Sequence, residues 1–316
     1  MTSLGLGLAA IGRPDYINIR ATKPLDKSKV AFNEKALEVL DEAYNLGIRH
    51  FDVAASYGYG EQFLLDWMSS RQNKDISIST KWGYTYVANW EIGYSGKHEI
   101  KEHSLNKLNE QWQFSKQFLP QLNIYQIHSA TLDSGVLSNT DVHNRLFELK
   151  QNHGFNIGIS TSGANQAEII DAAMSIYVDG QPLIDSYQVT FNILEQSTLK
   201  TLRRLRANSK IIIIKEALAN GRIFPWYKSK RYSEIYNLLK QLSDDYKVGI
   251  DAIALRYVID KVEPNWVLSG ASNVNQLRSN MDCLKIELPL EAIEILSKLS
   301  CNSNAYWTER SNLTWH

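Results

Sequence analysis

The chain has 316 residues, and its 34 lysines and arginines are balanced by 34 aspartates and glutamates, so the formal net charge is zero. This balance gives no electrostatic reason to expect nucleic acid or an anionic membrane as a partner. Apolar residues make up 44% of the chain, which is enough for a large core. No apolar run approaches the length of a membrane span, and residues 1–11 lack the basic region of a signal peptide. We therefore predict a soluble cytoplasmic protein.

Eight short β-rich runs alternate with amphipathic runs along the chain. The predicted strands are residues 4–10, 48–53, 76–81, 122–128, 156–161, 186–192, 210–217 and 266–271. The predicted helices are residues 33–46, 61–69, 105–118, 144–151, 165–175, 197–207, 232–246, 251–260 and 275–284. Eight alternations favour a closed parallel (β/α)8 barrel, a TIM barrel, over an open doubly wound sheet, which is the runner-up.

We find no linker, internal repeat or low-complexity tract, so residues 1–316 are predicted to form a single barrel domain. Two segments exceed what a barrel needs: a long aromatic loop at residues 84–103 and a tail at residues 301–316. Long connections are often functional, and the loop is equally compatible with a substrate wall or with surface packing. For the tail we favour packing on the outer surface. The two cysteines, Cys283 and Cys301, lack metal-ligand spacing, and we predict no metal site.

Four polar residues lie at or just beyond the ends of successive predicted strands: Asp52, Tyr57, Lys81 and His128. The carboxyl ends of parallel barrel strands meet at one mouth, where the chemistry of such barrels takes place. A carbonyl that accepts hydride develops negative charge on oxygen and needs an acid beside it. A tyrosine is a weak acid, with a reference pKa of about 10, and a nearby ammonium eases its loss of the proton. The aspartate would hold that lysine in place, and the histidine would orient the carbonyl oxygen.

Each of these residues also has an ordinary structural interpretation. Asp52 is compatible with a turn or helix cap, Tyr57 with core packing, Lys81 with a solvated charge and His128 with a hydrogen-bonded structural histidine. Their joint placement after the second, third and fourth strands favours a common site.

At these positions the chain resembles the aldo-keto reductase family. Residues 51–58 (FDVAASYG) resemble the aspartate-tyrosine motif of that family, residues 80–83 (TKWG) its lysine motif and residues 125–128 (YQIH) its histidine motif. The similarity extends from residues 5–7 to residue 280. The resemblance implies a barrel that binds NADPH, or NADH, in extended form, and reduces an aldehyde, ketone or sugar carbonyl or runs the reverse reaction. It implies Tyr57 as the general acid.

The resemblance also implies cofactor contacts. Ser160 and Gln188 match positions near the nicotinamide carboxamide, Thr161 stands where the family usually has asparagine, and Asn192 matches a polar position after the sixth strand. The remaining residues that the resemblance assigns to the cofactor are Lys215, Leu218, Gly221, Gly270, Ser272, Gln276 and Asn280. All of them are also compatible with ordinary polar or turn positions.

Two more of these positions, besides Thr161, depart from the family pattern. Lys215 stands where an aromatic residue usually stacks on the nicotinamide, and its side chain either covers the ring or turns away to pair with a carboxylate. Gln276 stands where an arginine commonly binds the 2′-phosphate, while Arg278 is expected to point elsewhere on the helix. We still expect NADPH to be preferred.

A second hypothesis, from another class, is a cofactor-sensing binding protein or accessory subunit with little turnover. The intact set of four polar residues favours the enzyme.

Overall fold

Eight parallel strands form a closed barrel in the computed structural model, which describes residues 2–19, 26–71, 75–227 and 229–315. The barrel strands are β1 (Ser3–Gly7), β2 (His50–Asp52), β3 (Ser77–Trp82), β6 (Leu122–Ile127), β7 (Asn156–Ser160), β10 (Ser186–Thr190), β11 (Ile211–Lys215) and β12 (Trp266–Ser269). Each strand pairs with its neighbours in chain order, and β12 pairs with β1 to close the ring. The predicted (β/α)8 barrel is confirmed, and the open sheet is excluded.

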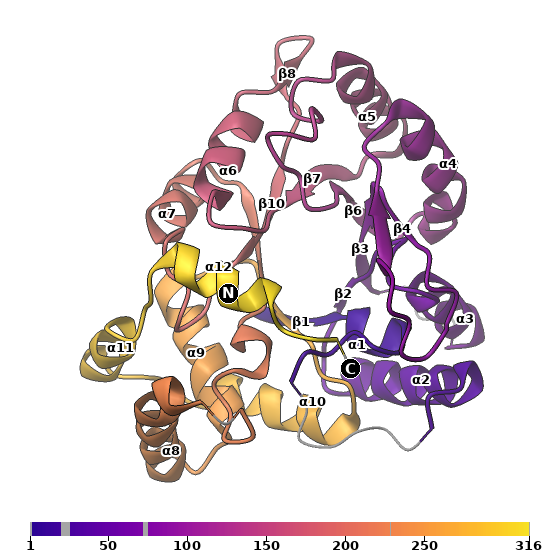
Figure 1. Cartoon of the computed structure of the whole chain (residues 1–316). Coiled ribbons are helices and arrows are strands. Elements are labelled where there is room, and N and C mark those ends of the chain that lie inside the picture. Colours follow the sequence, from indigo (N-terminus) through magenta and orange to yellow (C-terminus); the bar gives the residue numbers. More distant parts are fainter. Residues whose placement is uncertain (1, 20–25, 72–74, 228, 316) are drawn as a thin grey trace.

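Helices surround the barrel (Figure 1). They are α1 (Ala9–Gly12), α2 (Lys29–Asn45), α3 (Gly60–Arg71), α4 (Leu105–Ser115), α5 (Thr140–His153), α6 (Gln166–Met174), α7 (Leu199–Ala207), α8 (Ser233–Tyr246), α9 (Ile250–Val262), α10 (Val274–Met281), α11 (Leu290–Ser297) and α12 (Ser303–Ser311). Because the helices cover the outer face of every strand and the opposite face is enclosed by the ring, the strands can be apolar throughout. In β11, for example, Ile212, Ile213 and Ile214 are all buried.

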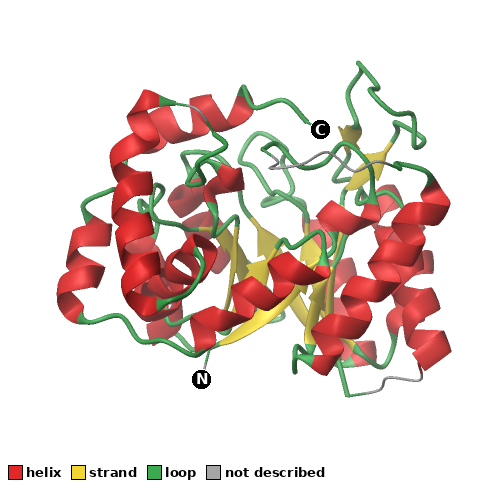
Figure 2. Cartoon of the chain, turned by 90° about the horizontal axis from the view of Figure 1, so that it is seen from below, coloured by secondary structure: helices red, strands yellow, loops and turns green. Residues whose placement is uncertain are grey.

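The barrel interior has an apolar layer and a polar layer. Ile124, Ile213 and Leu268 form a small apolar cluster of their own. They come from β6, β11 and β12, and since β6 is not a neighbour of the other two, these side chains meet inside the ring. The polar side chains of the strand ends, which form the candidate site, belong to the mouth at the carboxyl ends. Figure 2 shows the two chain ends on opposite sides of the strands, with the end of the chain on the side of the mouth.

The structure corrects several predicted boundaries. The first strand ends at Gly7 rather than at residue 10, because residues 9–12 turn into the short helix α1. Gly12 at the end of this helix allows the loop around Tyr57 to approach closely, since a Cβ there would lie 2.4 Å from the backbone oxygen of Tyr57. The strands predicted to end at residues 217 and 271 end at Lys215 and Ser269.

The two segments beyond the barrel contain regular structure that the sequence pattern did not predict. The loop at residues 84–103 contains an antiparallel hairpin of β4 (Tyr84–Tyr86) and β5 (Glu99–Lys101). A second hairpin, which lies outside both segments, joins β8 (Tyr177–Val178) to β9 (Gln181–Pro182) between α6 and β10. Near the end of the chain, α12 is a two-turn helix that begins at an Asn302 cap. Short helices and hairpins of this kind are stabilised by tertiary contacts, and a local sequence pattern does not indicate those contacts.

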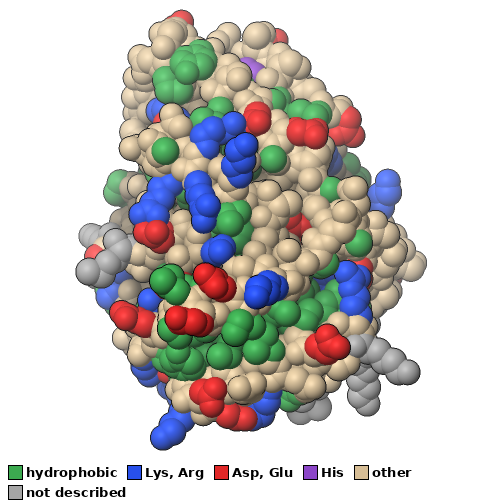
Figure 3. Space-filling view, turned by 90° about the vertical axis from the view of Figure 1, so that its left-hand side faces the viewer, with side chains coloured by type: hydrophobic (Ala, Val, Ile, Leu, Met, Phe, Trp, Pro, Cys, Tyr) green, Lys and Arg blue, Asp and Glu red, His purple; other side chains and the backbone are tan. Residues whose placement is uncertain are grey.

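Exposed apolar side chains gather on the outer side of the molecule that faces the viewer in Figure 3. Leu290 and Ile295 of α11, with Leu284, are among the most exposed large apolar residues of the described chain. None of the three lines the cavity at the mouth. No helix in the described ranges is long and apolar enough to cross a membrane, and both cysteines are free thiols.

Candidate active site

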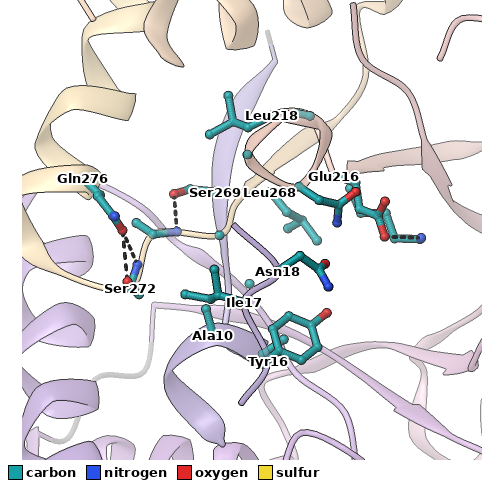
Figure 4. A pocket seen from close by; sticks show the side chains of 18 of the residues that line it. Ala10, Tyr16, Ile17, Asn18, Glu216, Leu218, Leu268, Ser269, Ser272 and Gln276 are labelled. Atoms are coloured by element: carbon teal, nitrogen blue, oxygen red, sulfur yellow. Dashed lines mark hydrogen bonds and ion pairs between the residues drawn. The ribbon is translucent and has the colours of Figure 1, made fainter. Parts of the chain in front are cut away.

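One elongated cavity of about 720 Å³ opens at the mouth of the barrel. Its walls include Asp52, Tyr57 and His128 at one end and Gln276 of α10 at the other. Figure 4 shows Ser272 and Gln276 on one side of this cavity, with Tyr16, Asn18 and Glu216 toward the other. The volume is in the range of about 300–1,000 Å³ that is usual for ligand and cofactor sites.

Asp52 and Lys81 form a buried ion pair beneath the cavity. Lys81 Nζ donates to Asp52 Oδ1 at 2.5 Å and to the backbone oxygen of Val53 at 2.9 Å. The second carboxylate oxygen, Oδ2, accepts from Ser79 Oγ at 2.6 Å and from Gln188 Nε2 at 2.7 Å. Side chains of β3 and β10 thus hold the carboxylate of Asp52, and this fixes the position of the lysine.

The Tyr57 hydroxyl has no hydrogen-bond partner among the described residues, and the residue lines the cavity. Its ring lies beside Lys81, whose Nζ is 4.8 Å from the ring centroid. The loop that carries Tyr57 docks on α1, where the N–H of Tyr59 donates to the backbone oxygen of Gly12 at 2.9 Å. A buried phenol with an open hydroxyl is available to donate a proton to a bound ligand.

The imidazole of His128 lies edge-on to Tyr57, with the ring centroids 5.7 Å apart. Its Nδ1 is 3.4 Å from Ser56 Oγ. Burial, followed by the positive charges of Lys81 and Lys215, lowers the pKa of His128 well below its usual value. The imidazole is therefore neutral at physiological pH, and a neutral ring can donate to a carbonyl oxygen while remaining uncharged.

In the protein without a ligand, burial and nearby negative charges outweigh any lowering of the pKa of Tyr57 by Lys81. The pKa of Tyr57 is raised well above its usual value, first by burial and then by the negative charges of Asp52 and Glu99, with Arg13 opposing them. The positive charge of Lys81 is largely offset by its partner Asp52. Tyr57 is thus fully protonated at neutral pH, and the lysine can assist only as the phenolate forms.

Most of the residues predicted to bind the cofactor line this same cavity. They are Ser160, Gln188, Lys215, Leu218, Gly221, Gly270, Ser272, Gln276 and Asn280. An added Cβ at Gly270 would meet nothing within 4 Å, so bare backbone faces open space there. Backbone of this kind beside the first turn of α10 suits an anionic group such as a phosphate.

Two of the predicted cofactor residues do not reach the cavity. The hydroxyl of Thr161 donates to Gln166 Oε1 at 3.1 Å, and the residue is completely buried. Asn192 is also buried, and its amide donates to the hydroxyl of Tyr306 at 2.9 Å. Both side chains are therefore engaged in hydrogen bonds inside the protein. The sequence could not show this, because their hydrogen-bond partners lie on other elements.

Lys215 pairs with a carboxylate, as one of the two positions that we considered requires, but its side chain still lines the cavity and does not turn away from it. Its Nζ donates to Thr190 Oγ1 at 2.9 Å and to Ser162 Oγ at 3.2 Å, and it lies 3.7 Å from Glu216 Oε1. Glu216 is shared with Arg310, whose guanidinium lies 3.3 Å from the same oxygen. The ammonium is therefore held mainly by two neutral hydroxyls at the cavity wall.

At the far end, Gln276 bends back onto its own loop. Its Oε1 accepts from the backbone N–H of Ser272 at 2.8 Å and from the Ser272 hydroxyl at 3.1 Å (Figure 4). Arg278 points away, as predicted, and pairs with Glu42 at 2.6 Å. The amide of Asn280 bonds to Ser269 and Asp251, and both of those residues also line the cavity.

Aromatic side chains surround the catalytic end, and one of them, Tyr84, belongs to the loop for which our sequence analysis left a substrate wall open. Tyr16 lies 5.9 Å from the ring of Tyr57, and Tyr84 of the hairpin lies 4.8 Å from the ring of His128. Trp315 packs on Tyr16 at 5.0 Å and lines the cavity, so our expectation that the tail packs on the outer surface is wrong for this residue. The amide of Asn18 holds the tail in place by donating to the backbone oxygens of residues 313 and 314.

The sequence model of the aldo/keto reductase family matches residues 3–300. The chain belongs to this family. Members of the family are oxidoreductases that use NAD(P)H and act on small carbonyl substrates, so this aldo/keto reductase is an enzyme.

Two curated relatives match this aldo/keto reductase over most of their length. An uncharacterized oxidoreductase of Bacillus subtilis is 24% identical and is matched over 82% of this chain and 88% of its own. A probable aryl-alcohol dehydrogenase of Saccharomyces cerevisiae is also 24% identical, over 84% of this chain and 88% of its own.

Solved structures agree on the fold. An aldo-keto reductase from Bacillus halodurans, in its holo form, superposes with a TM-score of 0.71 at 21% identity, covering 94% of this chain and 92% of that one. The glycerol dehydrogenase of Gluconobacter oxydans superposes with a TM-score of 0.70 at 18% identity, covering 94% of this chain and 90% of that one.

Proposed function

We propose that the protein reduces an aldehyde, ketone or sugar carbonyl with a reduced nicotinamide dinucleotide bound along the elongated cavity. The observation that carries the proposal is the open hydroxyl of Tyr57 at the wall of this cavity, beside the neutral imidazole of His128 and above the Lys81–Asp52 pair. No group of three or more potential metal ligands gathers among the residues that the structure describes.

The residues along the cavity fit a dinucleotide. Ser160 and Gln188 would hold the nicotinamide end, and Gly270, Ser272 and Gln276 would hold the phosphates and the adenosine. A bound reduced nicotinamide would supply the hydride to the carbonyl carbon. Tyr57 would donate its proton to the carbonyl oxygen as negative charge develops there, and His128 would donate a hydrogen bond that orients this oxygen. Lys81 would stabilise the phenolate that Tyr57 leaves behind.

The walls of the catalytic end favour an aromatic substrate within this class. Tyr16, Tyr84 and Trp315 present three rings around Tyr57 and His128, and aromatic faces pack well on one another at such distances. The probable aryl-alcohol dehydrogenase among the relatives agrees with this preference.

The proposal is tested by following NADPH and NADH oxidation with a panel of aromatic aldehydes, aliphatic aldehydes and aldoses. We expect turnover with several aldehydes and the lowest KM for the aromatic ones. Cofactor binding without turnover on any member of the panel would instead favour a cofactor-sensing role, and the absence of binding of either dinucleotide would refute the proposal.

We expect NADPH to bind somewhat more tightly than NADH, and Gln276→Arg to strengthen NADPH binding by about tenfold or more. A 2′-phosphate gains most from a bidentate guanidinium, whose charged hydrogen bonds are each worth about 1.5–3 kcal/mol, whereas the Gln276 amide is neutral and already engages Ser272. NADH affinity should change little, and the gain for NADPH should weaken as salt is added. Fluorescence titration of both dinucleotides measures these effects.

Arg278→Gln is the matched control for this helix. Arg278 is paired with Glu42 and lies outside the cavity, so its loss should leave both affinities unchanged. An equal change in both affinities for Gln276→Arg, or a loss of NADPH binding in the control, would show that Gln276 does not face the 2′ position.

A further inference from the structure

Among the described residues at the catalytic end of the cavity, positive charges exceed negative charges by one, because Lys215 and Arg310 share the carboxylate of Glu216. Asp52 is matched by Lys81 at 2.5 Å, Glu99 by Arg13 at 2.7 Å and Glu216 by Arg310 at 3.3 Å. His128 is neutral at physiological pH because its pKa is lowered well below its usual value. Lys35 and Asp251, the other Lys and Asp residues that line the cavity, belong to α2 and α9, and both helices pack against α10 at the opposite end.

Lys215 reaches the cavity because of the backbone at the end of β11. Successive side chains of a strand point to opposite faces, yet Lys215 and Glu216 both line the cavity. Glu216 has a φ of 54°, in the left-handed region that non-glycine residues rarely adopt. This turn directs both side chains into the mouth. Strained backbone of this kind is found most often at functional sites.

The hydroxyls that hold Lys215 place its ammonium near the proposed nicotinamide position. Ser162 and Thr190 each lie two residues beyond the proposed nicotinamide contacts, Ser160 and Gln188. Neutral hydroxyls orient an ammonium but do not cancel its charge, and the nearest carboxylate, Glu216, is shared with Arg310.

We propose that Lys215, which has only a share of the Glu216 carboxylate, is a partly compensated cation beside the nicotinamide ring, and that it makes the protein bind the reduced dinucleotide more tightly than the oxidised one. This inference rests on the proposed function. The oxidised ring carries a positive charge and the reduced ring is neutral, so a fixed ammonium repels only the oxidised form. At several ångströms and an effective dielectric constant of about 20, the repulsion changes the affinity by about tenfold or more.

The difference in affinity would make the reduced and oxidised dinucleotides behave differently during turnover. The protein would load the reduced dinucleotide from a mixed pool and release the oxidised one readily after hydride transfer. Product inhibition by NADP⁺ would be weak. A residue that contributes only packing at this position would affect both forms of the ring alike.

The test is the ratio of the dissociation constants of NADP⁺ and NADPH, measured by fluorescence titration with the wild type and with Lys215→Met, Lys215→Gln and Lys215→Arg. Methionine matches the length of the stem, glutamine keeps a hydrogen-bonding end and arginine keeps the charge. We expect the ratio to fall about tenfold in both neutral variants and to stay near that of the wild type in Lys215→Arg. Thermal melting of each variant confirms that it is folded.

Lys101→Met is the matched control, because Lys101 lies on the hairpin, bonds to Thr131 and does not line the cavity. Its ratio should equal that of the wild type. An unchanged ratio in both neutral variants, or an equal loss of affinity for both dinucleotides, would overturn the role of Lys215 while leaving the proposed function intact. Failure of the wild type to bind either dinucleotide would overturn both.

Discussion

We expect Tyr57→Phe to lower the rate of carbonyl reduction by about 10²–10⁴-fold, the usual contribution of a general acid. The change removes one oxygen from a side chain whose hydroxyl bonds to none of the described residues. The ring contacts with Tyr16 and His128 stay in place. Stability and dinucleotide binding should therefore be close to those of the wild type. Steady-state kinetics and fluorescence titration measure the two quantities separately.

Tyr84→Phe is the control for this substitution. Tyr84 also lines the cavity and contacts the ring of His128, but we assign no proton transfer to it. Its loss should affect KM more than kcat. Near-normal turnover in Tyr57→Phe, or an equal fall of kcat in the two variants, would remove Tyr57 as the proton donor.

We expect Lys81→Met to reduce activity to a similar degree, about 10²–10⁴-fold, because no cation would then stabilise the phenolate of Tyr57. The same change leaves the buried Asp52 carboxylate without its counter-charge. Removing one partner of a buried ion pair costs about 3–5 kcal/mol of stability, so lower activity of this variant alone could reflect unfolding.

The double variant Lys81→Met, Asp52→Asn separates the two effects. It removes both charges and keeps an amide beside Ser79 and Gln188, so the midpoint of urea unfolding should recover toward that of the wild type while activity stays low. Lys29→Ala is the control for a lysine outside the cavity, since its Nζ lies over the ring of Tyr59. If the double variant regains activity along with stability, Lys81 serves the fold and not the chemistry.

The sequence by itself determined the barrel and the candidate tetrad. Alternating β-rich and amphipathic runs reflect which side chains are buried, and eight alternations of strand and helix favour a closed barrel. Asp52, Tyr57, Lys81 and His128 could be found because parallel strands end at a common mouth, so that position along the chain translates into position in space. The cofactor contacts proposed at Ser160, Gln188 and Gly270 came from the family resemblance, and these three residues line the cavity.

Only the tertiary structure decided which polar side chains are available to a ligand. Thr161 and Asn192 have the residue types of a binding site, but hydrogen bonds to Gln166 and Tyr306 occupy them inside the protein. Trp315 reaches the mouth because the tail folds back onto Asn18, a contact across almost the whole chain. The charge of Lys215 is only partly matched because Arg310, far away in sequence, takes a share of Glu216. Hydrogen bonding and electrostatics depend on distances between elements, and local patterns in a sequence do not contain those distances.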